Sequence, residues 1–153
     1  MKKLLGILVL GLLWCNIGVA ACIEGNCIDG KGTYMWTSGK LTGDKYLGQF
    51  KDGKMHGQGT YTYLNGDRYI GYFKNGEEHG DGFFKSTKQG TSYVGQFKDG
   101  FIHGRGVFEL ANGKKYIGQF EYGTITGQGT MLHTDGTVDI GIFKDGKLIE
   151  RRY

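Results

Sequence analysis

The chain lacks proline altogether and has only three cysteines among its 153 residues. Beyond residue 21 two cysteines remain, too few to complete a tetrahedral zinc site by themselves. The net charge is small, +4 for the whole chain, so a strongly basic surface of the kind that binds nucleic acid is not expected. Patterns typical of helices are absent from residue 22 onward.

Glycine, in contrast, is abundant, with 30 residues, and it occurs beside 14% aromatic and 39% hydrophobic residues. Glycine does not recur at every third position, which excludes a collagen helix. The hydrophobic content argues against a disordered chain. Glycine and aromatic residues without proline are typical of short strands joined by tight turns.

One segment recurs along the chain at a nearly constant spacing. YLGQFKDGKMHGQG at 46–59 returns as YIGYFKNGEEHGDG at 69–82, as YVGQFKDGFIHGRG at 93–106 and as YIGQFEYGTITGQG at 116–129, and DIGIFKDG at 139–146 begins a further copy. The period is 23 or 24 residues, which predicts an array of small, similar structural units.

Each unit contains two turn motifs centred on glycine. Most are Asn-Gly or Asp-Gly, the pair typical of a type I′ hairpin turn, in which both central residues have positive φ. We therefore predict two hairpin turns per repeat. The turn glycines are Gly53, Gly66, Gly76, Gly90, Gly100, Gly113, Gly123, Gly136 and Gly146.

The stretches between these turns are short and rich in Tyr, Phe, Thr, Ile and Val, which predicts strands. In the motif YxGxF the tyrosine, glycine and phenylalanine are two residues apart, so they share one face of a strand. We predict that the rings pack over the glycines and form the core. The predicted core residues are Tyr46, Phe50, Tyr69, Phe73, Tyr93, Phe97, Tyr116, Phe120 and Phe143.

The predicted fold class is all-β: an elongated, single-layer antiparallel meander of repeated hairpins with about ten strands, preceded by an N-terminal hydrophobic signal helix. An insertion in the first unit predicts a protruding loop at 36–43, and an extra residue at 85–90 predicts a bulge or longer turn. The predicted divisions are 1–21 (signal peptide), 22–45 (Cys-containing segment and truncated first repeat), 46–68, 69–92, 93–115 and 116–138 (four repeats), and 139–153 (half repeat and tail).

The pattern YxGxFxxGxxHGxG resembles the MORN (membrane occupation and recognition nexus) repeat over about residues 26–148. The resemblance implies an elongated single-layer sheet that serves as a binding and assembly module, for lipid or, at least as often, for protein. The histidine of the pattern is present as His56, His79 and His103, but Thr126 replaces it in the fourth repeat. In the last unit Asp139 replaces the opening tyrosine.

The first residues combine a basic start, an apolar core from Leu4 to Trp14 and small side chains at 19–21. This pattern is typical of a bacterial secretory signal peptide, so we expect export to the periplasm, cell surface or medium, with an uncleaved anchor as the alternative. Two interpretations of the cysteines stay open. Cys22 and Cys27 form a disulfide, or Cys22 is lipidated at a lipobox-like sequence and Cys27 stays unpaired.

No reaction centre, cofactor or metal site is predicted. Equivalent histidines of successive repeats lie two strands apart, roughly 9.5–10 Å, whereas one zinc ion needs ligand nitrogens at about 2.0–2.1 Å. We therefore expect each histidine to hydrogen-bond near its own turn. The serines lack a nucleophile-elbow context, and no helix follows the GxG pairs as it would in a phosphate-binding loop.

The predicted function is a non-enzymatic repeat scaffold for protein–protein interaction or self-association outside the cytoplasm. One alternative is membrane association, through lipidated Cys22 or through a row of lysines on anionic lipid. Another is glycan binding on an exposed strip formed by the tyrosine and phenylalanine columns. The candidate lysines are Lys51, Lys74, Lys98 and Lys144.

Overall fold

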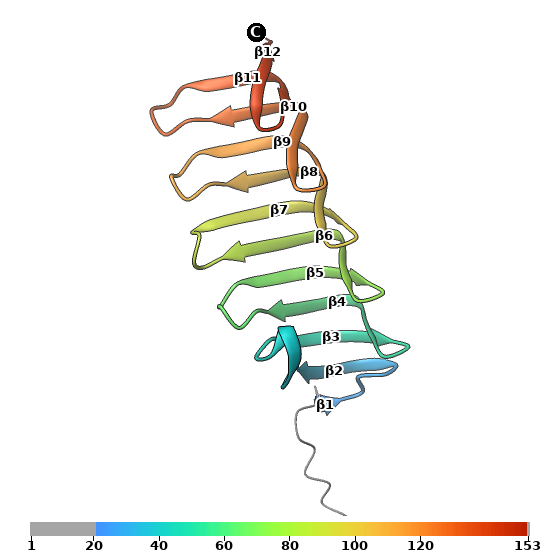
Figure 1. The fold of residues 1–153 in the computed structure, drawn as a ribbon. Helices are drawn as coiled ribbons and strands as arrows, with labels where there is room; N and C mark the ends of the chain where they lie inside the picture. Colours follow the sequence, from blue (N-terminus) through green and yellow to red (C-terminus); the bar gives the residue numbers. More distant parts are fainter. Residues whose placement is uncertain (1–20, 153) are drawn as a thin grey trace, which may run out of the picture.

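The protein forms one antiparallel sheet of twelve strands, each paired with its neighbours in sequence. A computed structural model describes residues 21–152. In Figure 1 the strands follow one another as a ladder one layer thick, with turns along both edges. The elements are β1 (Ala21–Gly25), β2 (Gly30–Met35), η1 (Gly39–Leu41), β3 (Lys45–Lys51), β4 (Lys54–Thr62), β5 (Arg68–Lys74), β6 (Glu77–Ser86), β7 (Thr91–Lys98), β8 (Phe101–Glu109), β9 (Lys115–Glu121), β10 (Thr124–Leu132), β11 (Val138–Lys144) and β12 (Lys147–Arg151).

The prediction of an all-β, single-layer meander is confirmed. The expected number of about ten strands is too low, because the N-terminal segment adds strands to the sheet: β1 pairs with β2, and β2 pairs with β3. The short 3₁₀ helix η1 lies within the predicted loop at 36–43. The predicted signal helix falls outside the described residues.

Two kinds of turn join most of the strands from β3 to β12; the turn between β6 and β7 is longer, with the Gly90 N–H donating to the Ser86 carbonyl. In the first kind both central residues have positive φ, as at Asp52 (50°) and Gly53 (70°), so type I′ is confirmed there. In the second kind only the glycine does: φ is 85° at Gly66, but it is not positive at Asn65. The Gly66 N–H donates to the Tyr63 carbonyl at 2.9 Å. The type I′ prediction is wrong for this turn, which is a three-residue loop ending in a glycine bulge.

One face of the sheet, the ring face, contains the core. Each repeat tyrosine is fully buried and lies edge-on between two phenylalanines, one from its own repeat and one from the next. Tyr46 contacts Phe50 and Phe73 with ring centroids at 5.1 and 4.9 Å, and Tyr116 contacts Phe120 and Phe143 in the same way. Because the stack crosses every repeat boundary, each repeat is stabilised by its neighbours.

Glycines lie in register across ten strands, and those of β3 to β10 lie beneath the tyrosine rings. The series begins at Gly32 in β2 and ends at Gly141 in β11, with every glycine paired to the next across the sheet. A Cβ at Gly59 would overlap the ring of Tyr46. The tyrosines can therefore approach the backbone closely only because these positions are glycine.

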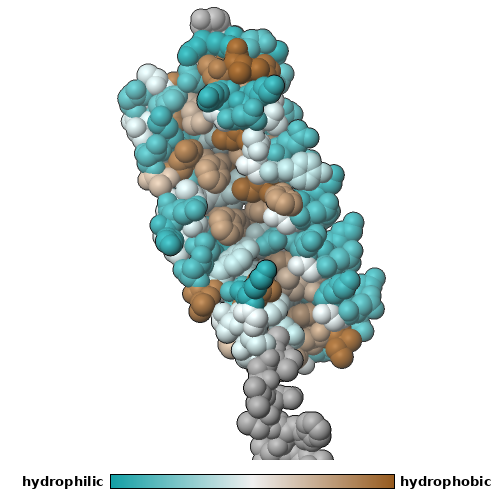
Figure 2. Space-filling view, in the orientation of Figure 1, coloured by the Kyte–Doolittle hydropathy of each residue, from teal (hydrophilic) through white to brown (hydrophobic). Residues whose placement is uncertain are grey.

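Figure 2 shows how the side chains are distributed over the surface. Hydrophobic side chains gather along the middle of the sheet, and hydrophilic ones border them on both sides. The hydrophilic borders follow the two edges where the turns lie. Within residues 21–152 no helix is both long enough and apolar enough to cross a bilayer.

Candidate functional site

The face opposite the rings, the open face, carries a row of exposed aliphatic side chains. The residue that follows each repeat tyrosine, or Asp139 in the last unit, points to this face because strand residues alternate. These side chains are 41–56% exposed. They are Leu47, Ile70, Val94, Ile117 and Ile140. This row was not predicted from the sequence, although the residue before the glycine of YxGxF, or of DIGIF in the last unit, is aliphatic in all five copies.

The partners of these residues on the intervening strands complete the row. Ile70 pairs with Phe83, Phe83 with Val94, Val94 with Val107, and Val107 with Ile117. Threonines occupy the remaining intervening positions, Thr60 and Thr130. We call this continuous row the aliphatic wall.

A second row, the polar wall, lies two residues away on the same strands and includes Gln49, Gln96, Arg105, Gln119 and Gln128. Its glutamines hold the β-bulges of the repeats: Gln96 Oε1 accepts the Arg105 N–H at 3.0 Å, and Gln119 Oε1 accepts the Gln128 N–H at 2.9 Å. Gln49 makes the equivalent bond in the first full repeat. At the bulges these backbone N–H groups do not bond to the neighbouring strand. The glutamine at this position therefore stabilises the bulge by accepting from them.

The repeat tyrosines satisfy the carbonyls at the same bulges from the ring face. The Tyr46 hydroxyl donates to the Gln49 carbonyl at 2.9 Å, and the Tyr93 hydroxyl to the Gln96 carbonyl at 3.1 Å. Burial raises the pKa of Tyr46 and Tyr93 from 10.0 to about 12, because a buried phenolate would lose its hydration. The phenols therefore remain neutral donors at physiological pH.

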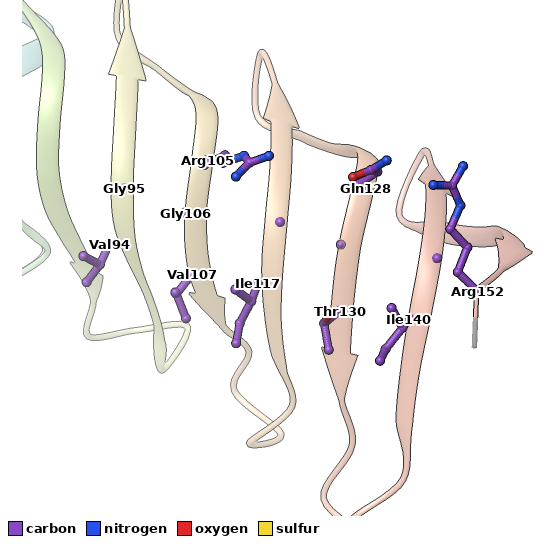
Figure 3. A pocket seen from close by; sticks show the side chains of 13 residues that line it. Val94, Gly95, Arg105, Gly106, Val107, Ile117, Gln128, Thr130, Ile140 and Arg152 are labelled. Carbon is purple, nitrogen blue, oxygen red and sulfur yellow. The ribbon is translucent and has the colours of Figure 1, made fainter.

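Between the two walls lie two cavities whose floor is glycine backbone. The cavity over the C-terminal half has a volume of about 580 Å³. Figure 3 shows Val107, Ile117 and Ile140 on one side of it and Arg105 and Arg152 on the other. The cavity over the N-terminal half has a volume of about 630 Å³ and is lined by equivalent positions of β2 to β6. We call the two together the glycine trench.

The dimensions of the trench favour an extended chain as its occupant. The two walls are two residues apart on each strand, which corresponds to about 6.7 Å. An α-helix with its side chains is about 10–12 Å across, too wide to reach the floor. The ten strands of the glycine series make the trench on the order of 40 Å long.

The charge of the trench differs between its two halves. The N-terminal cavity is lined by Lys31 and Asp81, which have opposite charges. The C-terminal cavity is lined by Arg105 and Arg152. Arg152 Nε contacts a Glu150 carboxylate oxygen at 3.3 Å, whereas Arg105 has no ion pair within residues 21–152. Arg105 is therefore the available cation of the C-terminal half.

The two N-terminal cysteines form a disulfide, with a Cα–Cα distance of 5.8 Å. Cys27 is buried, and its sulfur lies over Gly32, as the tyrosine rings lie over the glycines of later repeats. The bonded pair thus covers the first end of the stack. Lipidation of the Cys22 thiol would exclude this disulfide. Lipidation stays a prediction.

All four lysines of the proposed lipid-binding row are exposed, at strand ends beside the turns. Lys51 pairs with Lys54, but Lys74 pairs with Glu77. Glu121 occupies the equivalent position in the fourth repeat. The row is therefore accessible but interrupted, and lipid binding by it stays a prediction.

The histidines of the repeats do not behave as expected. The Nδ1 atoms of His79 and His103 are buried without a hydrogen bond, so our prediction of bonds near their turns is wrong for these atoms. His79 Nδ1 lies 3.6 Å from Asp99, too far for a hydrogen bond, and His103 packs against Tyr122. In the described part of the chain no three His, Cys, Asp or Glu side chains gather as metal ligands.

The tyrosine and phenylalanine columns proposed for glycan binding are buried at 0–7% exposure. A sugar could not stack on rings that pack against each other, so these columns do not form the exposed strip which that hypothesis required. Glycan binding by other parts of the surface stays a prediction.

A one-layer sheet of stacked hairpins with one open face is the architecture of a repeat scaffold. Comparison with protein families matches the MORN repeat at 28–40, 46–68, 69–91, 93–115 and 116–138. These segments make up more than half of the chain, which therefore belongs to the MORN repeat family and contains five repeats. Such proteins are generally non-catalytic scaffolds. No curated protein sequence matches the chain.

Proposed function

We propose that this MORN sheet is a non-enzymatic scaffold that holds an extended segment of a partner protein in the glycine trench. The observation that carries the proposal is the aliphatic wall, whose repeat positions are 41–56% exposed yet continuous from strand to strand. Contiguous apolar surface of this kind is typical of interaction sites. The adjacent backbone floor and polar wall supply hydrogen-bonding groups along the same line.

Site-specific photocrosslinking in the native host tests this proposal. A photoreactive amino acid replaces Ile117 in the aliphatic wall, and in a matched control it replaces Ile28, a more exposed isoleucine in the turn before β2. The crosslinked peptides are then sequenced by mass spectrometry.

We expect position 117 to capture one defined, aliphatic-containing segment of a partner, and position 28 not to capture it. The same adducts from both positions, or none from position 117, would contradict the proposal. Capture of a second copy of this chain would replace the partner by self-association.

We also propose that the protein works outside the cytoplasm. The Cys22–Cys27 disulfide supports this, because disulfides persist in oxidising compartments, and so does the signal-like pattern of residues 1–21. Intact-mass analysis of protein from its host should show loss of the leader and two hydrogens fewer than the reduced chain. A mass that includes Met1 and free thiols would contradict export, and added acyl chains would indicate the lipidated form.

A further inference from the structure

We infer that the C-terminal half of the trench binds an extended peptide in which acidic side chains alternate with aliphatic ones, and that Arg105 and the glutamine amides bind the acidic groups. This inference rests on the proposed function, which it makes more specific. It is drawn from the orientation of the glutamine amides, from the Arg105 guanidinium, which has no ion pair within residues 21–152, and from the aliphatic wall opposite both.

The glutamine amides present donors to the trench. The Oε1 atoms of Gln96 and Gln119 accept backbone N–H groups at the bulges, and only the oxygen of an amide can accept. This fixes the orientation of each amide, so its NH₂ group is the end left for a ligand. Neither NH₂ group has a hydrogen-bond partner within residues 21–152. The polar wall therefore requires an acceptor-rich occupant.

Arg105 adds the positive charge at the same place. The backbone N–H of Arg105 donates to Gln96 Oε1. The side chain of Arg105 lines the C-terminal cavity, as Figure 3 shows. It also lines an adjoining cavity of about 460 Å³ together with Gln96, Gln119 and His103. Glu121 is the acidic residue among the lining side chains there, and it forms no ion pair with Arg105. A guanidinium in this setting matches a carboxylate, which it can bind through two parallel hydrogen bonds.

The aliphatic wall opposite Arg105 determines the remaining residues of the bound peptide. Side chains of an extended peptide point alternately to two sides, so one set can contact Val107 and Ile117 while the other faces Arg105. In the N-terminal half Asp81 lines the equivalent wall and offsets the positive charge of Lys31, so a carboxylate gains less there than beside Arg105. The acidic part of the peptide thus belongs over β7 to β10.

Binding of three labelled octapeptides to the full chain tests the inference by fluorescence anisotropy. They alternate valine with glutamate, with glutamine or with lysine. We expect the glutamate peptide to bind about tenfold more tightly than the glutamine peptide, and the lysine peptide most weakly. Arg105→Gln should remove the glutamate advantage. Arg68→Gln, the matched control at an exposed arginine outside the cavity linings, should leave it unchanged.

Gln119→Glu separates binding from folding. A carboxylate oxygen still accepts the Gln128 N–H, so the thermal unfolding midpoint should stay near that of the original protein. The substitution removes the side-chain N–H donors and adds a negative charge. The affinity for the glutamate peptide should therefore fall about tenfold, and the affinity for the lysine peptide should rise.

Equal affinities for the glutamate and glutamine peptides, or no effect of Arg105→Gln, would overturn the inference while the trench remained a binding site. Absence of binding by all three peptides would also overturn it. The photocrosslinking experiment at position 117 then decides separately on the proposed function. Displacement of the glutamate peptide by decanoate at the same affinity would indicate an anionic amphiphile as the occupant and would likewise overturn it.

Discussion

The ring face and the open face of this sheet are built by alternate residues of the same strands, but only one of them is closed. On the ring face, Tyr93 is fully buried between Phe97 and Phe120. On the open face, the adjacent Val94 remains 54% exposed. A single-layer sheet thus obtains its core from one set of alternate positions and leaves the other set exposed.

The energetic consequence of this difference is large. A fully buried aromatic or aliphatic side chain contributes about 1.5–3 kcal/mol relative to exposure, and a half-exposed one contributes correspondingly less. Substitutions on the ring face should therefore act on folding, and substitutions on the open face should act on binding.

The largest effect should come from alkaline pH, because it acts on every repeat tyrosine at once. Burial raises the pKa of Tyr46 and Tyr93 to about 12, and of Tyr69 and Tyr116 in the same direction. The unfolded chain ionises near 10.0, so stability is fully present below that pH and is lost as pH rises toward 12. Circular dichroism during an alkaline titration should show cooperative unfolding in this window. An unchanged spectrum through pH 12 would contradict burial of the phenols.

Tyr93→Ala should cause the largest loss of stability among single substitutions. It removes a fully buried ring from the middle of the stack, a change that costs about 3–5 kcal/mol. Val107→Ala on the open face should cost less than about 1 kcal/mol, because Val107 is 38% exposed. Urea unfolding of both variants measures the difference, and similar losses would mean that the two faces are not distinct.

Gly106→Ala should destabilise the protein by about 1–3 kcal/mol through overpacking. A Cβ at this position would overlap the buried ring and hydroxyl of Tyr93. The control is Gly53→Ala, at a turn position where a Cβ would meet nothing within 4 Å and only its φ of 70° is unfavourable. Thermal unfolding should rank the first variant below the second, and the reverse order would rule out overpacking as the cause.

Gln119→Ala should cost about 0.5–1 kcal/mol, because the Gln128 N–H loses its acceptor at the bulge. Gln119→Glu keeps an acceptor and should cost less. Chemical denaturation distinguishes the two variants. If both lose the same stability, the glutamine does not hold the bulge through its oxygen.

Tyr122→Asn should give the smallest effect, a gain of about 0.5 kcal/mol. Tyr122 has a φ of 45° in a turn where the other repeats have Asp or Asn, and a bulky residue is strained in this region. Its contacts with Phe101 and His103 offset part of the strain. A decrease in the unfolding midpoint would mean that these ring contacts outweigh the strain.

The repeat period and the alternation within YxGxF were sufficient to predict the sheet and the columns of rings that the structure buries. The same dipeptide, however, forms two turn types: φ is 55° at Asn75 but not positive at Asn65, although glycine follows both. Loop length and the flanking strands decide this, not the dipeptide alone. The end strand β1 (Ala21–Gly25) lacks the motif and was not predicted.

The trench could be predicted only in part from the sequence. Its aliphatic wall follows from the residue after each tyrosine, and the same alternation that identified the core could have identified it. The donor character of Gln96 and Gln119 could not be foreseen, because it depends on which backbone N–H groups the bulges release. The availability of Arg105 likewise depends on its three-dimensional neighbours.

The most direct test is an NMR titration of the full chain with the valine–glutamate peptide. If the open face is the binding face, the resonances of the Gly106, Gly118 and Gly129 amides in the trench floor and of the Ile117 methyls should shift, and those of the Gly53 and Gly146 turn amides should stay unchanged. Saturable shifts confined to the turns, with the trench floor unchanged, would contradict binding on the open face.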